Sequence, residues 1–330
     1  MKRLLLFLLF LFLGIGLFAW VVQRIGWEEI QYSLSLFSGP KGFSIFLLTF
    51  FMLGAGAVRW RVILRSQGYA IPFSRLWQIY MGSFTIMFFT PMMFLGAELF
   101  RTYAARKLHD VPFSKAFASN IIDRLLEITA YIPVIFLGVW FFLWRTGSAS
   151  PQLLSISLGI LLLLAAAVVF LYSRSFRRKS ILRLFVRRNQ LQDMWELEHE
   201  VFRFFRWNSR AMWEGLFWSF LKSGIALSRA WLLLLFLGKY FGFFAALSIL
   251  SFQYLALFVP IPASLGSHDA IQAFAFEAFG GGSSTGVAFA FLMRTVEAAA
   301  ALLGIVLVAH VVLLLLRGKV MEVFGKFFRS

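Results

Sequence analysis

Long apolar runs dominate this chain, and short polar or basic segments separate them. Six runs are long enough to cross a bilayer as helices, which takes about 20 residues. They are Leu4–Val22, Phe43–Leu64, Phe113–Trp144, Leu153–Tyr172, Met212–Leu237 and Val287–Leu316. The first run has no small-residue cleavage site after it, so we expect it to be retained as a spanning helix. The pattern predicts an all-α polytopic membrane protein.

Two further apolar segments are interrupted near their middles by proline and glycine. Proline removes a backbone donor and clashes with the preceding helical turn, whereas glycine permits a sharp turn. Each segment is predicted to form a re-entrant hairpin of two short helices, and a single kinked spanning helix is the alternative. The segments are Pro72–Arg106, with its tip at Pro91 and Gly96, and Phe241–Gly280, with its tip at Pro262 and Gly266.

The basic residues favour re-entry, because cytoplasmic loops of membrane proteins are enriched in Lys and Arg. Six spans and two re-entrant hairpins place most of the 32 basic residues on one side. This topology predicts a protein of the cytoplasmic (inner) membrane with both termini in the cytoplasm. The basic segment 174–210 is predicted to lie on anionic inner-leaflet lipid as an amphipathic helix, or to pack on the protein as a linker.

Matched features recur at an offset of 170 residues (294 − 124). Arg124 and Glu127 in one span match Arg294 and Glu297 in another. The other matched pairs are Gly54 with Gly224, Arg59 with Arg229, and Gly96 with Gly266. Charge at membrane depth is costly and usually functional, and repeated charged units are typical of transporters.

This offset predicts an inverted repeat, because the two units begin on opposite sides of the membrane. The chain is then one transmembrane domain with five parts. They are a first helix and outer loop (1–40), repeat unit 1 (41–144), a helix with the basic loop (145–211), repeat unit 2 (212–316) and a basic cytoplasmic tail (317–330).

Composition supports membrane residence and narrows the chemistry. Hydrophobic residues make up 60% and charged residues 14% of the chain, and mean hydropathy is +0.80, whereas soluble domains hold about 25% charged residues. The net charge of +17 comes from loops between spans and does not indicate nucleic acid. With no Cys and four scattered His, neither a metal site nor a cofactor is expected.

The charged residues at membrane depth are candidates for binding a lipid headgroup. Arginine stays charged and pairs bidentately with phosphate, while carboxylates balance it or receive a cationic headgroup. We expect Glu127 and Glu297 to hold Arg124 and Arg294 while the site is empty. The candidate substrate-binding residues are Glu98, Arg101, Asp123, Arg124, Glu127, Arg229, His268, Asp269, Arg294 and Glu297.

Structural roles are the alternative for several of these residues. Each Arg-Glu pair has the spacing of an ion pair on one helix face, which lowers the cost of burial. Glu98 and Asp269 lie beside glycines and are alternatively hairpin caps, and His268 is more commonly bonded to backbone than active in proton transfer. Arg59 and Lys222 are expected to extend along the protein and place their charges at the membrane surface.

Three motifs carry a family resemblance over nearly the whole chain. The segments Thr90–Arg101, Asn120–Glu127 and Pro260–Ala270 resemble, in order, motifs of the flippase-like membrane proteins that include the transmembrane domain of lysylphosphatidylglycerol synthases. Two positions depart from the pattern: Ala97 stands in place of a glycine and Asp269 in place of a glutamate. The resemblance implies movement or handling of phospholipids or polyprenyl-linked lipids.

The combined expectation is a lipid translocase rather than an enzyme, working by alternating access. Its substrate is expected to be a phospholipid, an aminoacyl-phospholipid or a polyprenyl-phosphate-linked lipid. A membrane-embedded transferase or accessory subunit for lipid-linked glycan synthesis is the alternative, and a scaffold for a soluble synthase is a third option. A separate synthase or glycosyltransferase and a second copy of the chain are possible protein partners.

Overall fold

The computed structural model describes residues 28, 39–89, 95–147, scattered positions between 159 and 174, 192–256 and 266–327. Every regular element in this part of the chain is a helix. The elements are α3 (Pro40–Ser66), α4 (Phe73–Phe89), α5 (Leu95–His109), α6 (Phe113–Thr146), α8 (Gln192–Phe204), α9 (Arg210–Phe236), α10 (Phe243–Ala256), α11 (Ser267–Ala278) and α12 (Ser283–Phe327).

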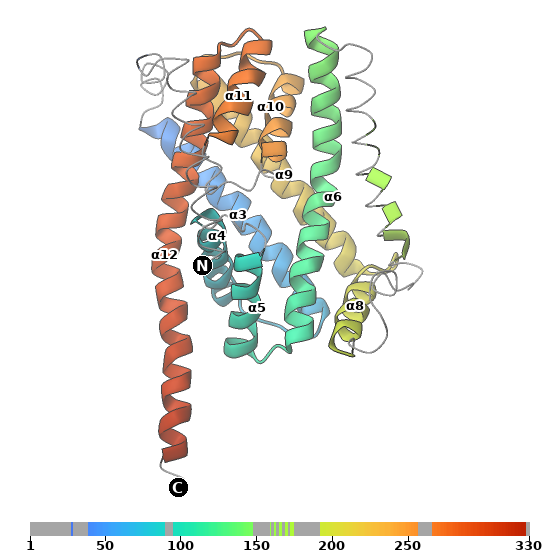
Figure 1. Ribbon diagram of the computed structural model, residues 1–330, viewed down its shortest axis with the longest axis vertical. Coiled ribbons are helices and arrows are strands. Elements are labelled where there is room, and N and C mark those ends of the chain that lie inside the picture. Colours follow the sequence, from blue (N-terminus) through green and yellow to red (C-terminus); the bar gives the residue numbers. More distant parts are fainter. Residues whose placement is uncertain are drawn as a thin grey trace, which may run out of the picture.

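Four helices are long and apolar enough to cross a membrane: α3, α6, α9 and the Ser283–Val311 part of α12. They correspond to four of the six spans that the apolar runs predict. The predicted span Leu4–Val22 and most of Leu153–Tyr172 lie outside the described residues. Helix α12 continues to Phe327 and projects beyond the other helices (Figure 1), so the basic tail begins as a continuation of the last span.

Each interrupted segment forms two short helices that pack against each other, α4 with α5 and α10 with α11. Helices α10 and α11 lie near the top of the molecule as drawn, and α4 and α5 lie below them (Figure 1). Helix α11 begins after Gly266, whose φ of 76° is readily adopted only by glycine. The predicted tip residues Pro91 and Pro262 lie outside the described residues, whereas Gly96 lies in the first turn of α5.

The long and short helices pack across the two halves of the chain. Helix α3 lies against α9, while α4 packs against α12 and α10 packs against α6. Hydroxyl groups bond across these contacts: Ser251 Oγ donates to the Val134 carbonyl at 2.7 Å, and Thr85 Oγ1 donates to the Ala301 carbonyl at 3.0 Å. Small residues and hydroxyls at such contacts are characteristic of helix association in membranes, where close approach replaces the hydrophobic effect.

Helix α8 lies in the second half of the basic segment 174–210. Its buried residues Val201 and Phe204 pack with Ile122 and Leu126 of α6, while Arg203 is exposed. Of the two alternatives for this segment, packing on the protein therefore holds for α8. Contact of the basic segment with anionic lipid stays a prediction.

Gly138 on α6 provides a test of this close packing. A Cβ atom at Gly138 would lie 1.9 Å from Ser251 Oγ and 2.7 Å from the Leu247 carbonyl oxygen. We expect Gly138→Ala to separate α6 from α10 and lower the melting temperature of the purified protein in detergent. Gly224→Ala is the control, because a Cβ there meets nothing within 4 Å and alanine favours helix by about 1 kcal/mol. Equal melting temperatures for the two variants would contradict the packing.

Candidate functional site

A cavity of about 190 Å³ lies where the two halves of the chain meet. Helices α3 to α6 and α9 to α12 all contribute side chains to its wall. Its charged wall consists of five cations and two carboxylates among the described residues. They are Arg101, Arg124, Lys222, Arg229 and Arg294, with Glu127 and Glu297.

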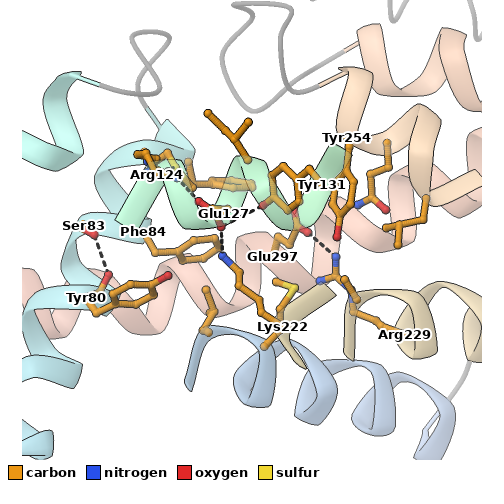
Figure 2. Close-up of a pocket in the computed structure, with 18 of the residues that line it drawn as sticks. Tyr80, Ser83, Phe84, Arg124, Glu127, Tyr131, Lys222, Arg229, Tyr254 and Glu297 are labelled. Carbon is orange, nitrogen blue, oxygen red and sulfur yellow. Dashed lines mark hydrogen bonds and ion pairs between the residues drawn. The ribbon is translucent and has the colours of Figure 1, made fainter. Parts of the chain in front are cut away.

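Glu127 on α6 is the centre of the larger charge cluster (Figure 2). Its carboxylate accepts from Arg124 Nη1 at 2.6 Å and from the Tyr131 hydroxyl at 3.0 Å, and it also accepts from Lys222 Nζ of α9. Arg59 Nη2 lies 3.7 Å away. The carboxylate is almost fully buried, so several cations share one anion.

Asp123, one helical turn before Glu127, pairs two further arginines. It accepts from Arg59 Nε of α3 at 2.6 Å and from Arg101 Nη1 of α5 at 3.0 Å. Arg59 and Asp123 are 0% and 1% exposed. Since an unpaired charge in such a place costs several kcal/mol, these bonds fix α3 and α5 against α6.

Helix α5 is also joined to α6 by Glu98 and Asn120. Glu98 Oε1 accepts from Arg124 Nε at 2.6 Å. Asn120 Nδ2 donates to the Glu98 carbonyl at 3.0 Å and to Thr102 Oγ1 at 2.9 Å. The first-turn carboxylate of α5 therefore orients an arginine of the cavity wall, which goes beyond the capping role that the sequence left open.

The second charge cluster is smaller and lies on α9, α11 and α12. Arg229 Nη2 donates to Glu297 Oε1 at 2.9 Å, and Arg294 pairs with Asp269. The other oxygen of Asp269 accepts from the Gly266 amide at 2.9 Å. Asp269 is therefore both a cap of α11 and the partner of a wall arginine, which combines the two roles that the sequence allowed.

The two clusters are connected by a pair of reciprocal hydrogen bonds. Arg59 Nη1 of α3 donates to Ser219 Oγ of α9 at 3.2 Å, and Arg229 Nη1 of α9 donates to Thr49 Oγ1 of α3 at 3.0 Å. The donors and the acceptors are each separated by 170 positions (229 − 59 and 219 − 49). The buried contact between α3 and α9 is thus made twice, with the roles of the helices exchanged.

Arg101 lines the cavity and has unused hydrogen-bonding capacity. Its guanidinium stacks over Trp60 and Tyr80, with 4.3 and 5.0 Å from Cζ to the ring centres. Nε and Nη2 are buried without a hydrogen-bond partner among the described residues. Buried donors of this kind are costly unless a ligand or water bonds them, and both atoms are enclosed by the surrounding side chains in this conformation.

The remainder of the cavity wall is mostly apolar and aromatic. Tyr131 of α6 and Tyr254 of α10 stack with 4.0 Å between their ring centres, and Phe84, Met87 and Ile128 lie nearby on the wall. A charged patch bordered by such a surface matches a molecule with an ionic headgroup and a hydrocarbon chain.

The structure brings the ten sequence-predicted residues into these two clusters and the cavity wall. Glu98, Asp123 and Asp269 do not line the cavity, but each pairs with a cation that does. His268 lines it, and its Nε2 is buried without a hydrogen-bond partner in the described part of the chain. The arginine that pairs with Glu297 is Arg229, from another helix, rather than a partner of the same helix face.

Two sequence interpretations are wrong. Arg59 is fully buried and paired with Asp123, and Lys222 reaches inward to Glu127, so neither places its charge at the membrane surface. A single lysine near the end of a predicted span does not indicate an inward-facing ion pair. For Arg59, the match with Arg229 at the 170-residue offset was a signal of a buried role.

Tyr131, Tyr254 and Gln253 were missed by the sequence analysis, since their place on the cavity wall depends on packing. Among the described residues, no group of His, Cys, Asp and Glu is arranged to hold a metal.

This geometry defines a polytopic α-helical membrane protein with a buried charged cavity between its two halves. The chain belongs to the family of the lysylphosphatidylglycerol synthase TM region, whose model matches residues 5–304. This confirms the resemblance seen in the three motifs.

A curated relative is less informative about activity. The chain is similar to the UPF0104 membrane protein MJ1595 of Methanocaldococcus jannaschii, with 24% identity over 257 residues, covering 73% of this chain and 75% of that protein. No solved structure matches the chain.

The charge cluster predicts unequal costs for removing its carboxylates. Glu127→Gln leaves Arg124, Lys222 and Arg59 short of their shared anion, and breaking a buried pair costs about 3–5 kcal/mol. Glu297 is 19% exposed and pairs with one arginine, so we expect Glu297→Gln to cost less. Unfolding in mixed micelles measures both free energies. A second change, Lys222→Met, should restore part of the stability of Glu127→Gln; a smaller loss for Glu127→Gln than for Glu297→Gln would contradict the shared-anion arrangement.

Proposed function

We propose that this protein is a lipid translocase that moves a phospholipid, an aminoacyl-phospholipid or a polyprenyl-phosphate-linked lipid across the cytoplasmic membrane. The observation that carries the proposal is the cavity between the two halves of the chain. It combines buried cations with an apolar wall, which suits a phosphate headgroup attached to hydrocarbon. Membership of a family described by a lipid synthase's membrane region is consistent with a lipid substrate.

The proposed transport mechanism is alternating access by two inverted units, residues 41–144 and 212–316. The order of elements supports it: each unit has a long helix, two short helices and another long helix. The packing of α4 on α12 resembles that of α10 on α6 with the units exchanged. The hydrogen bonds of Arg59 and Arg229 are also related by exchange of the units. Rocking of one unit against the other then opens the cavity to either side.

In this proposal the carboxylates hold the wall cations in place while the cavity is empty. A headgroup phosphate reaches the unpartnered Nε and Nη2 of Arg101, which are enclosed in this conformation, when the two units rock apart. It then competes with Glu127 for Arg124, since guanidinium binds both oxyanions in the same planar manner. The ion pairs thus stabilise the empty protein without closing the site to substrate.

The inverted arrangement requires the two short-helix pairs to enter from opposite faces of a membrane. Lys107 lies in the last turn of α5 in the first pair and is exposed, and Tyr240 precedes the second pair and is 87% exposed. In this chain, which has no Cys, we expect Lys107→Cys to react with an impermeant maleimide only from the cytoplasmic side, and Tyr240→Cys only from the outside. Labelling of both from one side would refute the inverted topology.

Lipid transport in proteoliposomes tests the proposed function. The wild-type protein should move labelled phospholipid between leaflets, and Arg101→Lys should lose at least tenfold in rate, because an ammonium lacks the planar fork. The control is Arg106→Lys, the same change on the same helix at an exposed position, which should retain the wild-type rate. The double variant Arg124→Ala/Glu127→Ala should likewise fail to transport even if it folds.

The transferase alternative predicts a different outcome in the same vesicles. Mass spectrometry of the recovered lipid should show an unaltered headgroup if the protein is a translocase. Normal transport by Arg101→Lys and by the double variant would leave these charges a structural role only.

A further inference from the structure

The cavity wall has an uneven charge that bears on which headgroups it accepts. Five cations line it against two carboxylates, Glu127 and Glu297. Both carboxylates are already engaged, Glu127 with Arg124 and Lys222, and Glu297 with Arg229. An ammonium group entering the cavity therefore meets cations and no carboxylate that lacks a cationic partner among the described residues.

The carboxylates behind the wall reduce this excess but do not remove it. Glu98, Asp123 and Asp269 each pair with a wall cation, and Arg59 is the one further cation of the two clusters. The two clusters then hold six cations and five carboxylates, an excess of one positive charge. At low dielectric such an excess attracts an anion strongly and repels a cation equally strongly.

Two cations of the clusters, Arg101 and Lys222, have no charged match in the other unit, and Arg101 is balanced by Asp123, which has none either. The excess is therefore assigned to Lys222. The position that matches it in the other unit is Met52 (222 − 52 = 170), and both side chains line the cavity. Lys222 therefore adds to one unit a charge that the other unit lacks. Removing its charge does not leave Glu127 unpaired, because Arg124 still donates to Glu127 at 2.6 Å.

From these observations we propose that the cavity selects a headgroup with one phosphodiester and no ammonium group, and that Lys222 sets this selectivity. The proposal rests on the proposed function, since it names the substrate class of the same site. A phosphodiester carries one negative charge and is neutralised by the cluster. A zwitterionic or aminoacylated headgroup brings an ammonium that the engaged carboxylates do not receive.

Binding to the full chain in detergent tests this selectivity without requiring transport. The probes are short-chain phosphatidylglycerol, phosphatidylcholine and lysyl-phosphatidylglycerol, with glycerol phosphate and inorganic phosphate to separate a lipid from a free anion. Dissociation constants come from ligand-dependent shifts of the melting temperature. We expect phosphatidylglycerol to bind at least tenfold more tightly than the other two lipids, and more tightly than the free anions.

Lys222→Met, which introduces the residue of the matching position, should reduce the preference for phosphatidylglycerol over phosphatidylcholine to below threefold. Met52→Lys adds a second positive charge and should shift preference toward a dianionic phosphomonoester lipid. The matched control is Lys107→Met, which removes the same charge from an exposed position of α5 outside the cavity and should preserve the wild-type preference.

Equal or tighter binding of lysyl-phosphatidylglycerol or phosphatidylcholine by the wild type would overturn the proposal, as would an unchanged preference in Lys222→Met. Tighter binding of free phosphate than of any lipid would make the site a soluble-anion site and overturn it too. Selective phosphatidylglycerol binding without transport in vesicles would instead reject the translocase function while the headgroup selectivity stands.

Discussion

The cost of an unpaired charge at membrane depth governs the organisation of this protein. Asp123 and Glu127 lie one turn apart on α6 and contact cations from α3, α5, α6 and α9. Because each of these charges is destabilising alone, the four helices are held at the distances that ion pairing requires. Arg101, Arg124 and Lys222, which pair with these two carboxylates, also line the cavity.

The two units share a packing scheme but differ in charge. The contacts of α3 with α9, of α4 with α12 and of α10 with α6 involve both units in equivalent ways, and Arg59 and Arg229 exchange roles across the centre. Arg101 and Asp123 of the first unit have no charged match at the 170-residue offset, and Lys222 of the second unit matches Met52. The difference in charge gives the cavity wall a net positive charge.

Ion pairs and hydrogen bonds that cross between the units bear on the alternating access proposed above. Lys222 of α9 pairs with Glu127 of α6, and the hydroxyls of Ser219 and Thr49 accept from arginines of the opposite unit. In the proposed cycle, a headgroup anion that competes for the wall cations weakens the Lys222 contact. Substrate binding and relative motion of the units are then linked through one carboxylate.

The sequence by itself determined the helical membrane class, the helices α3, α6, α9 and α12, and the division of each interrupted segment into two short helices, because apolar length and proline-glycine interruptions are local properties. It also pointed to nine charged residues and His268 in the apolar segments, since charge in an apolar run is conspicuous. Only the tertiary structure decided their partners. Glu297 pairs with Arg229 of another helix, and Arg59 and Lys222 point inward rather than toward the membrane surface. A long cationic side chain reaches in either direction along its helix, and the choice depends on whether packing brings a carboxylate within reach.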